Sequence, residues 1–369
     1  MVTTILFYLF IGIVLIQLSY YGLIFSKFAF SKPVRSKKKN IPVSVVVCAR
    51  NEEANLKELI PILLKQDYAE FELLLINDAS TDDSLKIMKD FEHQNPNIKV
   101  VDVVANDTFL SSKKYALTLG IKASKYDFLL FTDADCRPNS NQWIKAMSSR
   151  FTNTNSIIIG YGAYNKKKGS LLNKLIRFET VLTAIQYFSF AKIGMPYMAV
   201  GRNLAYRKDV FFSTNGFTTH MQIPSGDDDL FIKEAANAEN TAICFTKNSF
   251  TTSQPKTRLK DWLNQKRRHI HTSNYYAPNF KFLLGLFYTS QLSFWVLLII
   301  LLTLQINIYV VISLALIRLL LLFLIFGFSS KKFDENDLLP YLPVLEVFLI
   351  SLQLIIFISN LALKSNRWS

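Results

Sequence analysis

The chain is poor in the residues that build disulfide frameworks and zinc sites. Its 369 residues include three cysteines and four histidines. Cys48, Cys136 and Cys244 lie far apart, with no CxxC spacing and no pairing with histidine that indicates zinc. The sequence also has no internal repeat and no low-complexity tract beyond a short basic stretch at 31–40. These absences argue against a disulfide-bonded scaffold and favour a reduced, cytoplasmic domain.

Negative charge is scarce as well. The chain has 42 Lys and Arg against 28 Asp and Glu, a formal net charge of +14. The basic residues crowd into three ranges near the apolar segments, 27–39, 166–177 and 256–268. Anionic lipid headgroups account for this pattern with fewer assumptions than nucleic acid. Membrane lipids are therefore expected partners, and nucleic acid is not.

Long hydrophobic runs are abundant at both ends of the chain. A bilayer is crossed by about 20 apolar residues, and three runs reach that length: 4–25, 282–304, and 308–328 with its single Arg318. A fourth, 338–363, carries Pro340, Pro343 and Glu346 in its first half, which leaves open an interfacial or re-entrant start. The sequence predicts an integral membrane protein with a soluble middle.

The charges beside the first run predict its orientation. Residues 26–40 carry six Lys or Arg in fifteen positions, and short basic flanks stay on the cytoplasmic side. No basic residue precedes the run and no small-residue cleavage site follows it, so we expect a retained anchor. We therefore expect a multi-pass protein of the cell (inner or plasma) membrane, with residues 26 to about 280 cytoplasmic. The side of the tail stays open. The predicted divisions are an anchor (1–28), a basic linker (29–40), a soluble domain (41–255), a membrane-interface segment (256–280), a membrane region (281–363) and a tail (364–369).

Strand and helix patterns alternate in the soluble middle. Four apolar, strand-like runs at 41–48, 71–78, 97–107 and 126–135 are separated by helical patterns. Such alternation predicts an α/β fold with a mostly parallel, doubly wound sheet covered on both faces. Ligands bind such sheets beyond the carboxyl ends of the strands. The unusual polar clusters "ARNEE", "NDAS" and "TDAD" all follow these runs.

The cluster "TDAD" places Asp133 and Asp135 one residue apart. Two carboxylates at this spacing can share a hard divalent cation such as Mg²⁺ or Mn²⁺, whose remaining ligands are usually water and phosphate oxygens. The alternative is that both acids only solvate a loop. Two Asp residues at this spacing are common by chance, so the pair alone does not decide.

An ordered set of motifs decides more. "VSVVVCARNEEANL", "INDASTDDS", "SKKYALTLGI", "TDADC", "GRNLAYRKD", "SGDDDL" and "QKRRH" occur in the order and at the approximate separations of family 2 glycosyltransferases of the GT-A fold. The chain resembles the membrane-anchored branch of that family, which includes cellulose, chitin, hyaluronan and poly-N-acetylglucosamine synthases and ceramide glucosyltransferase. The resemblance covers roughly residues 41–275. It implies a GT-A nucleotide-sugar-binding domain with one N-terminal and two to three C-terminal transmembrane helices.

The resemblance implies roles on the donor side. The loop after the first strand and the Asp after the second hold the nucleotide, at Ala49, Arg50, Glu52 and Asp78; an Asx-type turn is the alternative for Asp78. Lys113 matches the lysine of the family's "GKxxAL" pattern and faces the diphosphate, although Ser112 replaces the glycine and Lys114 is a neighbouring candidate. The metal, Mg²⁺ or Mn²⁺, is implied at Asp135 and Asp133, with Asp133 also contacting the donor.

The later motifs imply the catalytic and acceptor side. "SGDDDL" resembles the family's "ED" motif, which makes Asp228 the general base and Asp227 its one-residue alternative; a helix start capped from Ser225 is the structural alternative. "QKRRH" matches QxxRW with His269 in place of Trp. Arg268 is implied at the leaving diphosphate. Four residues are implied on the acceptor side: Arg202, Asn203, Gln265 and His269.

The expected activity is inverting, metal-dependent hexosyl transfer from a nucleotide sugar, with UDP favoured over GDP, to a hydroxyl acceptor. The acceptor, a growing glycan or a lipid, stays open. Three or four membrane segments would make only a modest channel for a glycan, so a homo-oligomer or a synthase partner is also considered. The alternatives are a transporter and a non-catalytic sugar-binding anchor. Transporters place functional charges inside the membrane, where this chain offers Arg318 and Glu346, whereas its acids of catalytic spacing lie in the soluble part.

Overall fold

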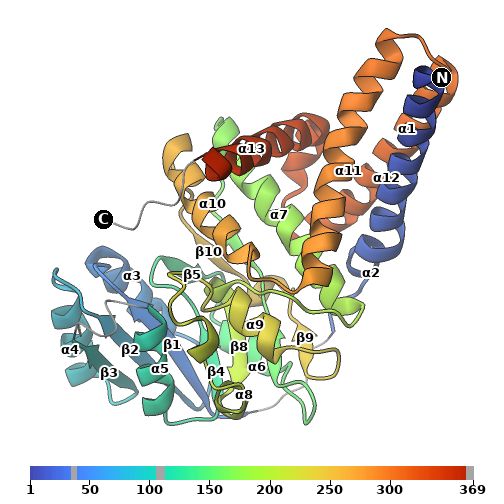
Figure 1. Ribbon diagram of the computed structural model, residues 1–369. Coiled ribbons are helices and arrows are strands. Elements are labelled where there is room, and N and C mark those ends of the chain that lie inside the picture. Colours follow the sequence, from blue (N-terminus) through green and yellow to red (C-terminus); the bar gives the residue numbers. More distant parts are fainter. Residues whose placement is uncertain (35–39, 105–112, 363–369) are drawn as a thin grey trace. The chain divides into compact units, whose positions relative to one another are not determined.

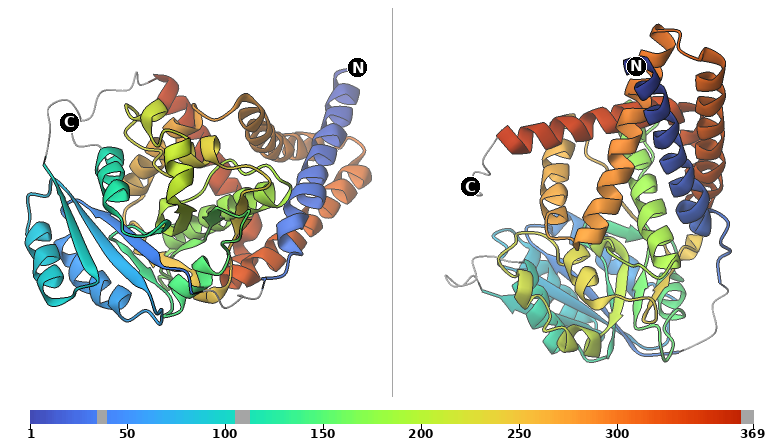
Figure 2. Two further views of the ribbon diagram at one scale, coloured as in Figure 1. Left: turned by 90° about the horizontal axis from the view of Figure 1, so that it is seen from below. Right: turned by 45° about the vertical axis from the view of Figure 1, so that its right-hand side comes forward.

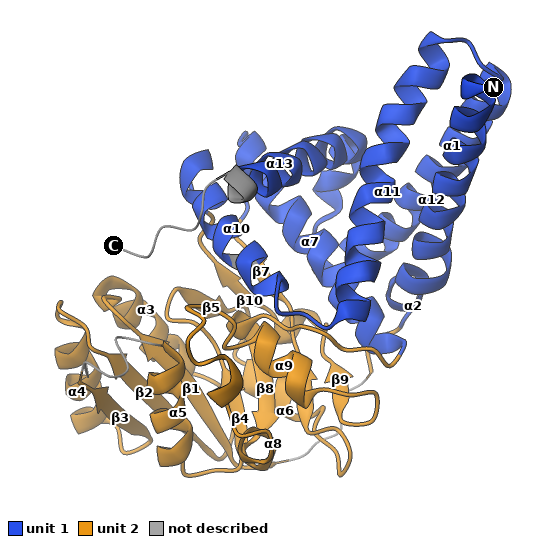
Figure 3. Ribbon diagram, in the orientation of Figure 1, with its two compact units in different colours: residues 1–31, 166–193, 256–369 blue, residues 32–165, 194–255 orange. Residues whose placement is uncertain are grey.

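The computed structural model describes residues 1–34, 40–104 and 113–362. It separates into two compact units, coloured differently in Figure 3. The helical unit comprises residues 1–31, 166–193 and 256–369, and the sheet unit comprises residues 32–165 and 194–255. The range 41–255, predicted as one domain, therefore contributes its residues 166–193 to the helical unit.

The sheet unit is built on seven strands in the order β3-β2-β1-β4-β8-β6-β9. Strands β1 to β4 are mutually parallel where they pair, and β8 runs antiparallel to both β4 and β6. A second, small sheet has the order β5-β10-β7. The strands are β1 (Val43–Ala49), β2 (Phe71–Asp78), β3 (Ile98–Val103), β4 (Phe128–Phe131), β5 (Cys136–Pro138), β6 (Ile157–Ile159), β7 (Gly162–Tyr164), β8 (Leu204–Arg207), β9 (Thr241–Ile243) and β10 (Thr251–Ser253).

Helices cover both faces of the central sheet, as the continuous apolar strands require. On one face Leu73 and Leu75 of β2 share a buried core with the apolar stripes of the helices that follow β1 and β2. On the other face Gly120 lies so close to Ile76 that an added methyl group would clash with it. The helices are α3 (Glu53–Leu64), α4 (Ser84–Gln94), α5 (Lys113–Ala123), α6 (Trp143–Ser148), α8 (Lys208–Ser213) and α9 (Asp229–Ala235), seen in Figure 1. The predicted mostly parallel, doubly wound α/β sheet is confirmed.

The helical unit contains the long apolar helices. Of the helices in the described ranges, four are long and apolar enough to cross a membrane: Val2–Ala29, Pro278–Thr303, Ile308–Phe333 and Asn336–Ser359. The unit comprises α1 (Val2–Ser19), a π-helical turn (Tyr20–Phe25), α2 (Ser26–Ala29), α7 (Leu171–Lys192), α10 (Leu259–Ser273), α11 (Pro278–Thr303), α12 (Ile308–Phe333), a 3₁₀ segment (Asn336–Tyr341) and α13 (Leu342–Ala362). Helices α1, α11 and α12 lie side by side in both views of Figure 2 and share one apolar core. The expectation of one N-terminal and two to three C-terminal membrane helices is confirmed, with three at the C-terminal end.

Ion pairs tie the inserted helix α7 to the C-terminal helices. Arg177 is buried and donates from Nε to a carboxylate oxygen of buried Glu335 at 2.8 Å. Lys266 on α10 lies 2.5 Å from an oxygen of Glu179 on α7. These contacts explain why residues 166–193 group with the helical unit, although the sheet unit surrounds them in sequence.

A polar cluster joins four helices inside the apolar part of this unit. Arg318 on α12 has no exposed surface and pairs with Glu346 on α13, at 2.7 Å for one of its two hydrogen bonds. Arg318 also donates to Gln17 on α1 at 2.9 Å, and Gln291 on α11 donates to Glu346 at 2.9 Å. We call these four residues the buried polar clamp. Each group of the Arg318–Glu346 pair is thereby held by further hydrogen bonds, as buried charges require.

Candidate active site

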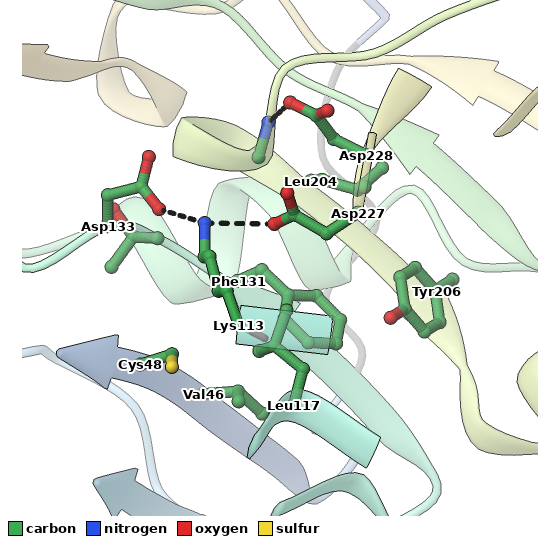
Figure 4. Close-up of a pocket in the computed structure, with 12 residues that line it drawn as sticks. Val46, Cys48, Lys113, Leu117, Phe131, Asp133, Leu204, Tyr206, Asp227 and Asp228 are labelled. Atoms are coloured by element: carbon green, nitrogen blue, oxygen red, sulfur yellow. Dashed lines mark hydrogen bonds and ion pairs between the residues drawn. The ribbon is translucent and has the colours of Figure 1, made fainter. Parts of the chain in front are cut away.

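A pocket opens in the sheet unit where the polar clusters follow β1 and β4. Its upper wall is charged and its lower wall is apolar (Figure 4). The lining residues are Val46, Cys48, Lys113, Leu117, Phe131, Thr132, Asp133, Gly201, Leu204, Tyr206, Asp227 and Asp228. The pocket therefore combines residues from five separated stretches of the chain, and it lies where a parallel sheet binds its ligands.

Lys113 joins two of the acids across the pocket. Its Nζ lies 2.9 Å from Asp133 Oδ1 and 2.9 Å from Asp227 Oδ2. Burial opposes the charged ammonium, but the two carboxylates raise the pKa of Lys113 well above its ordinary value. The first turn of α5 thus supplies a fixed cation between the turn after β4 and the segment ahead of α9.

Asp227 and Asp228 differ in their surroundings although they are adjacent. Burial would raise the pKa of Asp227, but Lys113 outweighs it and holds that pKa below its usual value. Burial, reinforced by the charges of Asp227 and Asp229, raises the pKa of Asp228 to about 8. Neighbouring acids whose pKa values are driven apart are typical of acid–base sites.

Backbone N–H groups orient the Asp228 carboxylate. Oδ2 accepts from the Gly201 N–H at 2.6 Å, and Oδ1 accepts from the Asp229 N–H at 2.7 Å, which makes Asp228 the N-cap of α9. A Cβ added at Gly201 would lie 3.3 Å from Asp228 Oδ2, so glycine permits this close approach. The structural alternative of a helix start capped from Ser225 is wrong in its position, because α9 begins at Asp229 and its cap is Asp228.

The turn after β4 gathers a second group of ligand atoms. Asp133 is half-buried, Asp135 is exposed and Cys136 is buried, and their candidate ligand atoms all lie within 4.8 Å of one another. The carboxylate oxygens are the hard donors that Mg²⁺ and Mn²⁺ take. The turn is held by Arg137, whose Nη1 donates to the Ala134 carbonyl oxygen at 2.9 Å. Its Nη2 donates to Asn55 on α3 at 3.0 Å, a contact for which the sequence offers no signal.

The residues predicted around the nucleotide lie at the ends of β1 and β2. Ala49 is buried and Arg50 is exposed. Burial raises the pKa of Asp78, which Arg50 and Lys113 oppose. Burial and then the charges of Asp135 and Asp133 raise the pKa of half-buried Glu52. Glu52 therefore lies close to the negative charges of the turn after β4.

Sequence reasoning missed the bonds that fix these loops. Asn51 donates its N–H to Ser80 Oγ at 3.1 Å and accepts from the Thr81 N–H at 2.7 Å, so the loops after β1 and β2 hold each other. Asn51 and Ala79 both have left-handed backbones, with φ of 56° and 49°. An alanine with this φ is unusual, and such conformations concentrate at functional sites.

Arg202 and Asn203, predicted on the acceptor side, are bound by the protein itself. Arg202 donates to the Ala163 carbonyl oxygen at 3.0 Å and lies 4.4 Å from the centroid of the Tyr164 ring. Asn203 is fully buried, donates to the carbonyl oxygens of Tyr161 and Ser249, and accepts from Trp143. These contacts give both side chains a structural role.

The remaining predicted residues lie on α10 in the helical unit. Arg268 is exposed and Gln265 is half-buried, and the side chain of His269 lies outside the described part of the structure. α10 belongs to a different compact unit from the pocket. The roles of these three residues stay predictions.

Comparisons with known proteins agree with the fold and the motifs. Residues 44–212 match the model of glycosyl transferase family 2, and residues 131–329, more than half of the chain, match that of glycosyl transferase family group 2. Poly-β-1,6-N-acetyl-D-glucosamine synthase of Staphylococcus epidermidis is 31% identical over 103 residues, which are 28% of this chain and 24% of that protein. An uncharacterized glycosyltransferase of Haemophilus influenzae is 31% identical over 127 residues, 34% of this chain and 38% of that protein. The matches thus span well under half the length of these relatives.

A solved structure extends the agreement to the fold. The mannosyltransferase PcManGT of Pyrobaculum calidifontis, determined with GDP-Man and Mn²⁺, superposes with a TM-score of 0.60 over 94% of this chain and 98% of that one, at 15% identity. At that identity the likeness bears on the fold alone, which is GT-A-like. With the family match over more than half of its length, the chain belongs to glycosyl transferase family group 2.

Proposed function

We propose that this protein transfers a hexose from a nucleotide sugar, favouring a UDP-sugar, to a hydroxyl acceptor at a membrane, with inversion at the anomeric carbon. One observation carries the proposal: Lys113 pairs with both Asp133 and Asp227 in a pocket that Asp228 also lines. The ammonium of Lys113, beside the carboxylates of the turn after β4, suits the binding of a diphosphate. The oriented carboxylate of Asp228 suits the activation of an acceptor hydroxyl.

In this scheme the donor is held by residues at the ends of β1, β2 and β4 and in the first turn of α5. The loop of Ala49, Arg50 and Glu52, with Asp78, holds the base and ribose. Lys113 contacts the diphosphate as a point charge, and Asp133 contacts the donor sugar. The relative named for poly-N-acetylglucosamine synthesis supports a nucleotide-sugar donor of this kind.

The proposed metal ligands are Asp135 and Asp133. Their oxygens lie within the 4.8 Å cluster, and their charges add to the effect of burial in raising the pKa of nearby Glu52, so the residues present fit a divalent cation. When bound, Mg²⁺ or Mn²⁺ neutralises negative charge that develops on the departing diphosphate. Asp135 is exposed, so its carboxylate is accessible to an ion from solvent.

Asp228 is the proposed general base. As the acceptor oxygen bonds to the anomeric carbon, the bond from that carbon to the diphosphate oxygen breaks, and the hydroxyl proton passes to the Asp228 carboxylate. The N–H groups of Gly201 and Asp229 fix that carboxylate. Asp227 keeps its charge through Lys113, which leaves Asp228 as the acid that takes up a proton near neutral pH.

We assign the helical unit to the acceptor and the membrane. Arg268 is proposed to stabilise the departing diphosphate, because a guanidinium suits phosphate, and Gln265 and His269 are proposed on the acceptor side. The structural contacts of Arg202 and Asn203 support placing them beneath that side. The apolar helices support membrane attachment, and the basic flank after the first helix supports a cytoplasmic catalytic unit.

Turnover by purified protein tests this function. The protein in nanodiscs receives Mn²⁺ or Mg²⁺ and a donor panel that includes UDP-N-acetylglucosamine, UDP-glucose and GDP-mannose, and released nucleotide and product length are followed. Nucleotide release that requires an added lipid or glycan acceptor is expected. Long polymer assigns a growing glycan as acceptor, and a monoglycosylated lipid assigns single transfer. Binding of nucleotide sugars without turnover by any donor would leave a sugar-binding anchor and overturn the proposal.

A further inference from the structure

Two adjacent lysines in the first turn of α5 face different surroundings. Lys113 lines the pocket, whereas Lys114 is only 2% exposed and lies away from it. The Lys114 Nζ donates to three backbone carbonyl oxygens: His220 at 2.7 Å, Ile223 at 3.1 Å and Ser225 at 2.8 Å. One ammonium group thereby uses its three donors on a single loop.

That loop leads directly into the acids of the pocket. Ser225 is followed by Gly226, whose backbone is left-handed with φ of 95°, and then by Asp227 and Asp228. Because only one residue separates Ser225 from Asp227, displacement of the 220–225 loop would move both carboxylates.

Beyond its first residue the loop is not deeply packed. His220 is buried and its ring lies 5.9 Å from that of Phe217, but Gln222 and Pro224 are exposed, and Met221, Ile223 and Ser225 are only half-buried. Within it the Ile223 N–H donates to the His220 carbonyl oxygen at 3.1 Å. An exposed loop held by few apolar contacts opens easily unless polar contacts hold it.

Burial disfavours the charged form of Lys114, and nearby carboxylates favour it. Burial lowers the pKa of Lys114 to about 8, and the nearby charges of Asp227, Asp229, Asp228 and Glu234 oppose that shift. A buried ammonium is tolerated when all of its donors are satisfied and acids surround it.

We infer that Lys114 is a positioning residue, which anchors the 220–225 loop so that Asp227 and Asp228 are held in place for transfer. This inference rests on the proposed function for its catalytic consequence, but the anchoring itself is a property of the folded protein. The interpretation that Lys114 contacts the diphosphate is replaced by one in which α5 serves the site twice, through Lys113 at the acids and Lys114 at the loop that carries them.

Lys114→Met tests the anchor, with Lys122→Met as the matched control because Lys122 is exposed near the end of the same helix. Hydrogen exchange followed by mass spectrometry reads peptides over 216–230 and, as reference, over β1 and α3. In Lys114→Met the loop amides are expected to exchange about tenfold faster or more, since three charge-assisted bonds are lost, while the reference peptides stay unchanged. Lys122→Met is expected to match the wild-type protein in both regions.

Kinetics separate positioning from binding. For Lys114→Met we expect kcat to fall about 10- to 100-fold while the Kd for the nucleotide changes less than about twofold, because the acids are displaced and the donor contacts are not. Loop exchange equal to the wild-type rate, or a Kd that weakens in step with kcat, overturns the inference. If Lys114→Met does not fold, Lys114→Arg, which keeps the charge but not the fit, is expected to speed loop exchange, and wild-type exchange in that variant overturns it.

The two proposals fail separately. If no donor is turned over, the proposed function fails, while the exchange measurement still decides whether Lys114 anchors the loop. If turnover is observed and the loop exchanges normally in the variant, the function stands and the positioning role of Lys114 is lost.

Discussion

Lys113 and Asp227 form an ion pair of 2.9 Å that joins the first turn of α5 to the segment ahead of α9. The same ammonium holds Asp133 at 2.9 Å, so one side chain connects the proposed donor and acceptor sides of the pocket. A diphosphate that draws Lys113 towards itself would therefore weaken the ion pair between Lys113 and Asp227. This connection makes Lys113 the first target for substitution.

Lys113→Met is expected to weaken binding of UDP or GDP about 10- to 100-fold, because a charge-assisted phosphate contact is removed. Calorimetric titration with the free nucleotide measures the loss directly. Lys122→Met on the same helix removes an equal charge at an exposed position and serves as control. Unchanged nucleotide affinity in Lys113→Met would contradict the diphosphate contact.

Asp228→Asn is expected to lower kcat by about 10²- to 10⁴-fold, the usual contribution of a general base. Nucleotide affinity should stay close to the wild-type value, since Asp228 is proposed to serve the acceptor. Glu239→Gln is a control, because Glu239 is an exposed acid of the same unit. A variant that keeps more than a tenth of wild-type kcat would move the base to another residue.

The pH profile follows from the charges around Asp228. Burial and then Asp227 and Asp229 raise the pKa of Asp228 to about 8. A base must be ionised to accept a proton, so kcat/KM is expected to rise as pH increases towards 8. Asp227→Asn removes a neighbouring negative charge, so the rise of kcat/KM with pH, measured from initial rates, should shift to lower pH. If this rise stays in place or moves to higher pH, the pKa of Asp228 does not determine it.

Metal removal should stop transfer and spare the fold. We expect a chelator to abolish turnover and added Mn²⁺ or Mg²⁺ to restore it, and Asp135→Asn to weaken Mn²⁺ binding about tenfold or more, measured by electron paramagnetic resonance. Asp90→Asn, an exposed acid on α4, is the matched control. Full activity in the chelator, or wild-type Mn²⁺ affinity in Asp135→Asn, would contradict the proposed ligands.

The buried polar clamp predicts a non-additive pair of substitutions. Arg318→Met leaves Glu346 buried without its ion-pair partner and should destabilise the protein strongly, by about 3–5 kcal/mol for a buried pair. The double variant Arg318→Met/Glu346→Leu removes both charges and should recover much of the loss. Thermal unfolding in detergent measures the series, with Leu320→Met, exposed on the same helix, as control. A double variant no more stable than Arg318→Met would show that the unpaired charge of Glu346 is not the cause of the loss.

Sequence reasoning reached the fold because the relevant signals are local. The β-branched run before "ARNEE" and the apolar run before "NDAS" became β1 and β2 almost to the residue. The apolar stretches at the chain ends were long enough to identify without any knowledge of packing. These elements are determined by the spacing of apolar residues and the length of apolar runs, and both can be counted along the chain.

The site could be predicted only in part because its contacts are long-range. The motifs identified which acids to examine, but nothing in "SKKYAL" distinguishes the lysine in the pocket from the one beneath the 220–225 loop. That distinction depends on which side of α5 faces each of two segments more than a hundred residues away. The same holds for Asn203, whose polar side chain satisfies three partners inside the core rather than facing a ligand.

The buried polar clamp also bears on how the protein is made. The amide oxygen of Gln17 accepts from Arg318 across 301 residues of sequence, so the first apolar helix is synthesised long before this donor exists. Because domains fold largely as they emerge, the sheet unit, which ends at residue 255, can form before Arg318 is synthesised. A chain truncated before α12 would keep the hydrogen bond from Gln17 to Ser290 on α11 but would leave the Gln17 amide oxygen, inside an apolar bundle, without the guanidinium of Arg318.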